Sequence, residues 1–74
     1  MYETGEQDAE LGTLIAWHDT LDSKSKAEYE EGYAHKAWEM GANDRESGRP
    51  MIERTHFKLD SAWSRYVEGF EGTN

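Results

Sequence analysis

β-Branched aliphatic residues are scarce in this chain: Val67 is the only valine, and Ile15 and Ile52 are the only isoleucines. β-Strands are enriched in such residues and alternate them with polar ones, and no segment shows this alternation. Apolar residues instead recur at α-helical spacing in three segments. We therefore expect an all-α fold, a small three-helix domain in which a helical hairpin carries an extra N-terminal helix.

The first helix is predicted from about Thr4 to Leu21. Thr4 and Gln7 fit a capping box at its start, and acidic residues in the first turn favour the positive end of the helix dipole. The apolar stripe of this segment comprises Leu11, Leu14, Ile15, His18 and Leu21.

A second capping box, Ser25 with Glu28, opens a helix predicted to reach about Ala42. Gly32 lies inside this helix, where glycine is unfavourable by about 1 kcal/mol relative to alanine. The glycine is either a weak point or a place where a neighbouring helix approaches closely, and the aromatic residues around it favour close approach. The apolar stripe comprises Tyr29, Tyr33, Ala37 and Met40.

Residues 43–54 are predicted to form the linker between the second and third helices, because Pro50 blocks helix continuation. The third helix begins between Thr55 and Asp60. It carries the strongest amphipathic stripe of the chain, made of Leu59, Ala62, Trp63, Tyr66, Val67 and Phe70. Residues 1–74 then form a single domain, in which 1–5 and 72–74 are expected to fray.

Aromatic residues are numerous for a chain of 74 residues: three Trp, four Tyr and two Phe. A disordered chain of this charge has few aromatics, so we expect a folded domain. Trp63 and Tyr66 are predicted to lie in the core, whereas Trp38 and Trp17 fit either the core or an interface. Ala-Trp occurs once in each predicted helix, and the uneven spacing indicates one large anchor per helix rather than a solenoid.

The chain is strongly acidic, with 16 Asp and Glu against 8 Lys and Arg and a formal net charge of -8. This charge repels nucleic acids and anionic membranes and favours basic protein surfaces, although solubility alone also explains it. The acidic residues concentrate in the first two predicted helices, because from Asn43 to Asn74 there are 5 Lys and Arg against 6 Asp and Glu. We expect a polarised molecule with an acidic half.

Several kinds of chemistry are excluded or disfavoured. The chain has no cysteine, which excludes disulfides, thiolate zinc sites and a cysteine nucleophile. Glu31, His35 and Glu39 share one helix face and could chelate a metal weakly, but ordinary solvated contacts explain the same spacing, so no metal site or cofactor is predicted. Three short helices leave no room for a pocket of about 300 Å³, and we predict a non-enzymatic protein without catalytic residues.

No apolar run approaches the roughly 18 residues that a membrane span requires. The acidic N-terminal residues do not resemble a secretory signal or a transit peptide. The expected location is therefore the cytoplasm of a bacterial or an infected host cell.

The stretch from Glu31 to Glu71 resembles the ribosome modulation factor family of short bacterial and phage proteins. The matching residues are Gly32-Tyr33, Trp38, Gly41-Ala42, Gly48-Arg49-Pro50, Ala62-Trp63 and Gly69-Phe70. The resemblance implies two helices around a proline-containing linker and ribosome binding through basic residues that touch ribosomal RNA. This chain departs from the family in its acidity and its additional N-terminal helix.

Two functions follow as hypotheses. The first is a phage-type inhibitor or regulator that docks acidic faces on a basic, nucleic-acid-binding surface of a larger protein, such as RNA polymerase or a nuclease. The second is a ribosome-associated modulator that uses the linker arginines. A self-associating helical module, possible as a homodimer, is a third interpretation. The predicted partner-binding residues are Trp17, Trp38, Glu28, Glu31, Glu39, Asp44, Arg45 and Arg49.

Overall fold

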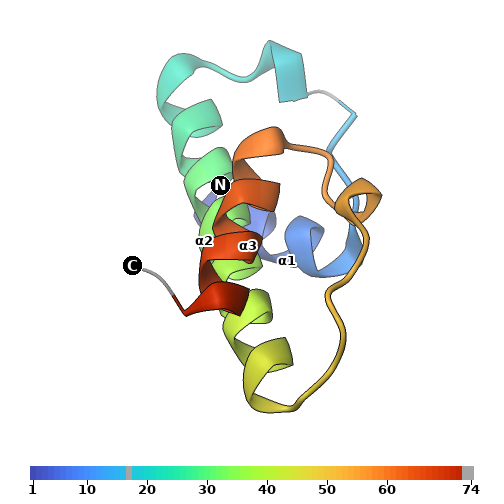
Figure 1. The fold of residues 1–74 in the computed structure, drawn as a ribbon. Helices are drawn as coiled ribbons and strands as arrows, with labels where there is room; N and C mark the ends of the chain where they lie inside the picture. Colours follow the sequence, from blue (N-terminus) through green and yellow to red (C-terminus); the bar gives the residue numbers. More distant parts are fainter. Residues whose placement is uncertain (17, 73–74) are drawn as a thin grey trace.

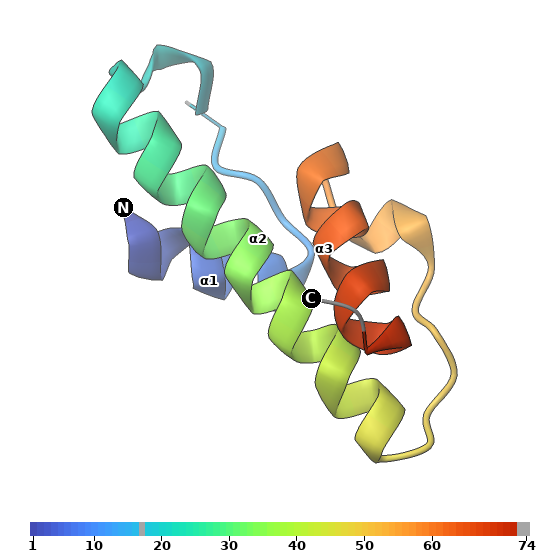
Figure 2. The same cartoon turned by 60° about the vertical axis from the view of Figure 1, so that its left-hand side comes forward.

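Three α-helices carry the fold in the computed structural model, which describes residues 1–16 and 18–72 (Figure 1). They are α1 (Tyr2–Leu11), α2 (Ser23–Glu46) and α3 (Asp60–Glu71), and short 3₁₀ helices at His18–Thr20 and Arg54–His56 lie in the two connections. Both α1 and α3 pack against α2 (Figure 2). The described residues contain no strand, which confirms the all-α class and the hairpin with an extra N-terminal helix.

α1 is shorter than the sequence predicts and begins earlier. It starts at Tyr2, with Met1 as its N-cap and no side-chain cap, so the predicted role of Thr4 as a cap is wrong. It ends at Leu11 because Gly12 adopts a left-handed conformation, φ 75°, that continues the chain away from the helix axis. The apolar stripe predicted beyond this point lies in the connection, and Leu11 itself is 72% exposed.

α2 is longer than predicted at both ends. Its N-cap is Asp22, whose carboxylate accepts a hydrogen bond from the backbone N–H of Ser25 at 2.8 Å, so the capping box predicted at Ser25 is wrong. The helix continues to Glu46 and takes up the first four residues of the predicted linker. α3 starts at Asp60, the later of the two predicted starting points.

The crossing of α1 and α2 depends on two glycines. A Cβ at Gly32 would collide with the backbone carbonyl oxygen of Tyr2, and a Cβ at Gly5 would collide with that of Tyr29. The two backbones therefore touch without side chains between them. This contact confirms that Gly32 allows the close approach of a neighbouring helix.

A second crossing of the same kind joins α2 to α3. A Cβ at Gly41 would collide with the carbonyl oxygen of Tyr66, and a Cβ at Gly69 would collide with that of Trp38. Since an α-helix turns by about 100° per residue, Gly32 and Gly41 lie on nearly opposite sides of α2. α1 and α3 therefore cover opposite sides of the central helix, as Figures 1 and 2 show.

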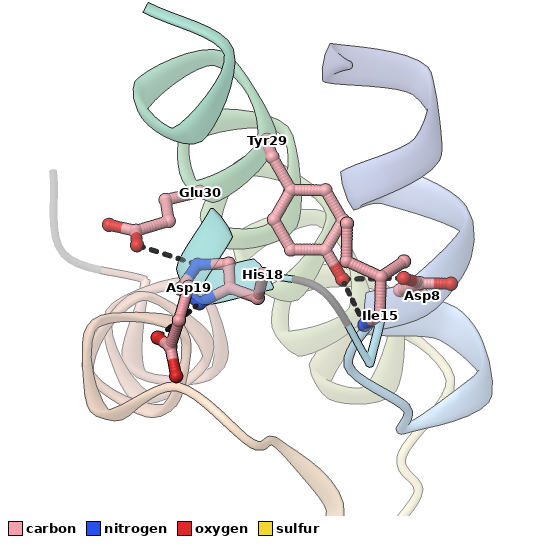
Figure 3. Close-up of polar contacts among 6 residues, drawn as sticks. All are labelled: Asp8, Ile15, His18, Asp19, Tyr29 and Glu30. Atoms are coloured by element: carbon pink, nitrogen blue, oxygen red, sulfur yellow. Dashed lines mark hydrogen bonds and ion pairs between the residues drawn. The ribbon is translucent and has the colours of Figure 1, made fainter. Parts of the chain in front are cut away.

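Each crossing is accompanied by a tyrosine that ties the connection to both helices. In the first unit, the Tyr29 hydroxyl on α2 donates a hydrogen bond to Asp8 on α1 at 2.5 Å and accepts one from the backbone N–H of Ile15 at 3.2 Å (Figure 3). The hydroxyl thus satisfies a carboxylate and a loop N–H at once.

The second unit repeats this arrangement. The Tyr66 hydroxyl on α3 donates to Asp44 on α2 at 2.5 Å and accepts from the backbone N–H of Ile52 at 3.0 Å. The fold is therefore built from two overlapping helix–loop–helix units that share α2. Their common pattern is Gly-x-x-Asp on the first helix, Ile in the connection and Tyr-x-x-Gly on the second helix.

The core is small and largely aromatic. Tyr66 lies fully buried, as predicted, whereas Trp63 is partly exposed and stacks on Tyr66 with ring centroids 5.7 Å apart. A third tyrosine, Tyr33, accepts a hydrogen bond from the backbone N–H of Lys58 at 3.1 Å. The buried apolar residues are Ala9, Tyr29, Tyr33, Ala37, Phe57, Ala62 and Tyr66.

Candidate binding surface

α1 presents a row of carboxylates at the surface. Gly5 and Ala9 are buried, so the residues on either side of this buried face point outward or along the edge of α2. Glu3, Glu6 and Glu10 line a shallow groove of about 320 Å³ together with Gln7 of α1 and Lys36 of α2. The Lys36 ammonium lies 3.9 Å from Glu10, a surface ion pair that links the two helices.

His35 of α2 joins this row to the rest of the surface. Its Nδ1 atom lies 3.6 Å from Oε2 of Glu6 and 3.3 Å from Oε1 of Glu39, one helical turn further along α2. The Tyr2 ring lies nearby, with its centroid 6.0 Å from that of His35. Burial, followed by the carboxylates of Glu6, Glu31 and Glu39, raises the pKa of Tyr2, because its phenolate would add another negative charge to this cluster.

A depression of about 380 Å³ continues the surface on the other side of His35. Its walls are formed by Glu31, Ala34, His35 and Trp38 of α2 and by Arg65 of α3. This finding corrects the expectation that the domain is too small for such a volume. The depression exists because α1 and α3 pack on opposite sides of α2 and leave a strip of α2 uncovered between them.

We refer to two neighbouring parts of this surface below. The acidic face is the set Glu3, Glu6, Glu10, Glu31 and Glu39. The Trp38 depression is the set Glu31, Ala34, His35, Trp38 and Arg65. His35 belongs to the depression and contacts Glu6 of the acidic face, so the two parts are continuous.

The structure brings together about half of the predicted partner-binding residues. Glu31 and Trp38 line one depression, and Glu39 contacts it through His35. Glu28 is exposed and lies on the same side of α2 by helical spacing. Trp17 lies outside the described residues.

The remaining predicted residues lie in the second unit. Asp44 accepts a hydrogen bond from the Tyr66 hydroxyl, and its Oδ1 atom lies 3.2 Å from Nε of Arg49. The Asp44 side chain is only 13% exposed. The Arg45 guanidinium lies against Gly72, at the C-terminal end of α3, where the helix dipole favours a positive charge. These contacts hold the second unit together, at a distance along α2 from the acidic face.

The carboxylates of α1 are the functional candidates that sequence reasoning missed. The sequence predicts that the first helix belongs to an acidic half, but it does not single out Glu3, Glu6 and Glu10 as partner-binding residues. The signal that identifies their position is the small pair Gly5 and Ala9, spaced by four residues, which marks the face that meets another helix.

His18 forms a separate set of contacts in the N-terminal half of α2, with Tyr29 and Glu30. His18 is 8% exposed, and its Nε2 atom lies 2.8 Å from Glu30 while Nδ1 lies 3.6 Å from Asp19 (Figure 3). Its ring lies 5.5 Å from that of Tyr29. These contacts join the first 3₁₀ helix to α2 beside the Tyr29 hydrogen bonds.

The side chains of this surface are carboxylates, the His35 imidazole, the Trp38 indole and two cations, Lys36 and Arg65. The carboxylates can pair with Lys or Arg of a partner, and the indole can pack against its apolar side chains. Within residues 1–16 and 18–72, no helix combines the length and the apolar character that crossing a membrane requires. Comparisons of the chain with protein-family models, with curated proteins and with solved structures found no match in any of the three.

Proposed function

We propose that this protein is a non-enzymatic binding module that docks its acidic face on a basic surface of a larger protein, of the kind that binds nucleic acid. One observation carries the proposal: the acidic face lies directly beside the Trp38 depression. Carboxylates can pair with Lys and Arg of the partner while an apolar or aromatic side chain enters the depression against Trp38. RNA polymerase and nucleases are partners of this chemistry.

The charge distribution supports the acidic face as the contacting side. Its five carboxylates stand near three basic groups, His35, Lys36 and Arg65, and each of these already contacts a carboxylate of the chain. A strongly negative surface attracts a basic groove at long range and can occupy sites that phosphates would otherwise fill. By occupying the basic groove of its partner, the protein would then inhibit that partner.

The ribosome-associated alternative relies on the arginines around the second connection. Arg49 pairs with Asp44 at 3.2 Å, and Arg54 lies 3.6 Å from Asp60. Two of the three arginines are therefore partly neutralised by neighbouring carboxylates, which favours the acidic face as the basis of the proposal.

The proposal is tested by measuring binding of the purified chain to core RNA polymerase, a ribonuclease and ribosomes at increasing salt. We expect one nucleic-acid-binding enzyme to bind, with an affinity that falls as salt rises. DNA or RNA that binds in the basic groove of the partner enzyme should displace the chain. The triple variant Glu3→Gln, Glu6→Gln and Glu10→Gln should weaken binding by at least about tenfold.

The matched control is the triple variant Glu46→Gln, Glu53→Gln and Glu71→Gln, which removes the same charge from exposed positions outside the acidic face. We expect it to retain affinity within about twofold to threefold, because distant charges are largely screened. Equal losses in the two variants, or an affinity independent of salt, would contradict docking through the acidic face. Binding to ribosomes that depends on Arg45, Arg49 and Arg54 would support the alternative.

A further inference from the structure

We propose that Glu6, His35 and Glu39 form a binding site for a divalent transition-metal ion of the zinc class, shared between α1 and α2. The three side chains offer two carboxylate oxygens and one imidazole nitrogen, a donor set that Zn²⁺ accepts. Their ligand atoms all lie within 4.8 Å of one another. The site shares Glu6 and Glu39 with the acidic face, but its argument does not rest on the docking function proposed above.

The two distances from His35 are close to those between ligand atoms of a tetrahedral ion. Zinc binds nitrogen and carboxylate oxygen at about 2.0 to 2.2 Å, so neighbouring ligand atoms of a tetrahedron lie about 3.3 to 3.5 Å apart. Nδ1 of His35 lies 3.3 Å from Oε1 of Glu39 and 3.6 Å from Oε2 of Glu6. The Glu6 and Glu39 oxygens lie within 4.8 Å of each other, and rotation of the two flexible Glu side chains is expected to bring all three atoms to this spacing when an ion binds.

The backbone holds the three residues in place. His35 and Glu39 are separated by one turn of α2, so their side chains lie side by side on one face. Glu6 follows Gly5 and His35 lies one turn beyond Gly32, and these two glycines form the close crossing of α1 and α2. The third ligand therefore comes from a second helix, at the point where the two backbones touch.

The surroundings favour a cation and leave room for a fourth ligand. Glu31 adds a further negative charge next to Tyr2 and the depression. The His35 side chain is 51% exposed, so water or a donor group of a partner can reach the ion. Three protein ligands with one open position is the arrangement of zinc sites that exchange ligands.

The test is a titration of the full chain with ZnCl₂ by calorimetry, together with the visible absorption spectrum of the chain with CoCl₂. We expect one Zn²⁺ per chain and the intense d–d bands of tetrahedral Co²⁺. Zn²⁺ should also raise the thermal unfolding midpoint, because it binds only where both helices are in place. Mg²⁺ should not displace it, since Mg²⁺ prefers octahedral oxygen ligands.

Three variants decide whether these residues are the ligands. His35→Gln and Glu6→Gln should each weaken Zn²⁺ binding by at least about tenfold. The control, Glu3→Gln, removes the same charge as Glu6→Gln from the exposed residue one turn before it on α1, and it should change the affinity by less than about threefold. Circular dichroism should show that all three variants keep the helical fold.

Two results would overturn the proposal. If Glu3→Gln weakened binding as much as Glu6→Gln, the ion would be held only by diffuse attraction to the acidic face. If the chain bound no Zn²⁺ and gave no tetrahedral Co²⁺ spectrum, His35 would only form ion pairs with Glu6 and Glu39. Neither result would affect the docking proposal, whose test uses no metal.

Discussion

Tyr29 and Tyr66 are buried, and the hydroxyl group of each forms hydrogen bonds with two other polar groups of the chain. Each hydroxyl donates to an aspartate and accepts from a loop N–H, so each joins three segments of the chain. A hydrogen bond to a charged group contributes more than one between neutral groups. The two tyrosines therefore matter beyond the apolar area that their rings bury.

Replacing Tyr29 by Phe should lower the free energy of unfolding by about 1 to 3 kcal/mol, because the Asp8 carboxylate and the Ile15 N–H lose their partner. Urea unfolding of Tyr29→Phe, Asp8→Asn and the double variant measures the coupling between the two side chains. Additive losses in the double variant would show that the hydroxyl and the carboxylate do not interact. Tyr66→Phe with Asp44→Asn repeats the test in the second unit.

The same burial predicts a loss of stability in alkaline solution. Desolvation, reinforced by the hydrogen bond to a carboxylate, raises the pKa of Tyr29 and of Tyr66, and desolvation raises that of Tyr33. The unfolded chain releases these protons near pH 10, whereas the folded chain retains them to higher pH. The contribution of these tyrosines to the free energy of unfolding should therefore be fully present below about pH 10 and be lost as the pH rises through the folded-state pKa values.

Urea titrations between about pH 9 and pH 11 measure this loss. Tyr29→Phe should reduce the slope of stability against pH, since it removes one of the buried phenols. A stability independent of pH in this range would mean that the tyrosines titrate alike in the folded and the unfolded chain.

Among the elements, the glycines of the two crossings decide how closely the helices approach. Gly32→Ala and Gly69→Ala should each destabilise the fold by about 2 kcal/mol or more, because the added methyl group meets backbone rather than a movable side chain. Helix propensity alone predicts the opposite, a gain of about 1 kcal/mol. Thermal unfolding of the two variants distinguishes these predictions, because close packing predicts a lower unfolding midpoint and helix propensity predicts a higher one.

The ends of the helices show what the sequence could and could not predict. The stripe of α3, with Ala62 and Tyr66, identified a buried helix face because its periodicity is uninterrupted. Leu11 and Leu14 have the same spacing, yet Gly12 between them ends α1, and nothing local distinguishes a left-handed glycine from a helical one. Asp22 and Ser25 are both good N-caps, and local sequence did not rank them.

The candidate site was predicted only in its α2 part for a related reason. Glu31, Trp38 and Glu39 share a helix face that follows from spacing within one element. Glu6 reaches His35 only because α1 crosses α2 at two glycines, and that contact joins residues far apart in sequence. Pairings between elements depend on the packing of the whole chain, which periodicity does not encode.

At the scale of the whole molecule, the excess of negative charge acts against the compact state. With a net charge of -8, the carboxylates of the acidic face repel one another, and salt screens this repulsion. The thermal unfolding midpoint should therefore rise with added NaCl. The triple Gln variant of Glu3, Glu6 and Glu10 should be more stable at low salt and respond less, and an unchanged salt response would contradict this account.

The spacing of the two crossing glycines along α2 limits where the chain can accept insertions and deletions. The two crossing glycines, Gly32 and Gly41, lie on opposite sides of α2 because of the number of residues between them. One extra residue between them would rotate α3 by about 100° around α2 relative to α1 and would separate His56 from the Ala9 carbonyl oxygen, which lies 3.0 Å from its Nε2 atom. The segment between the two glycines must therefore keep its length.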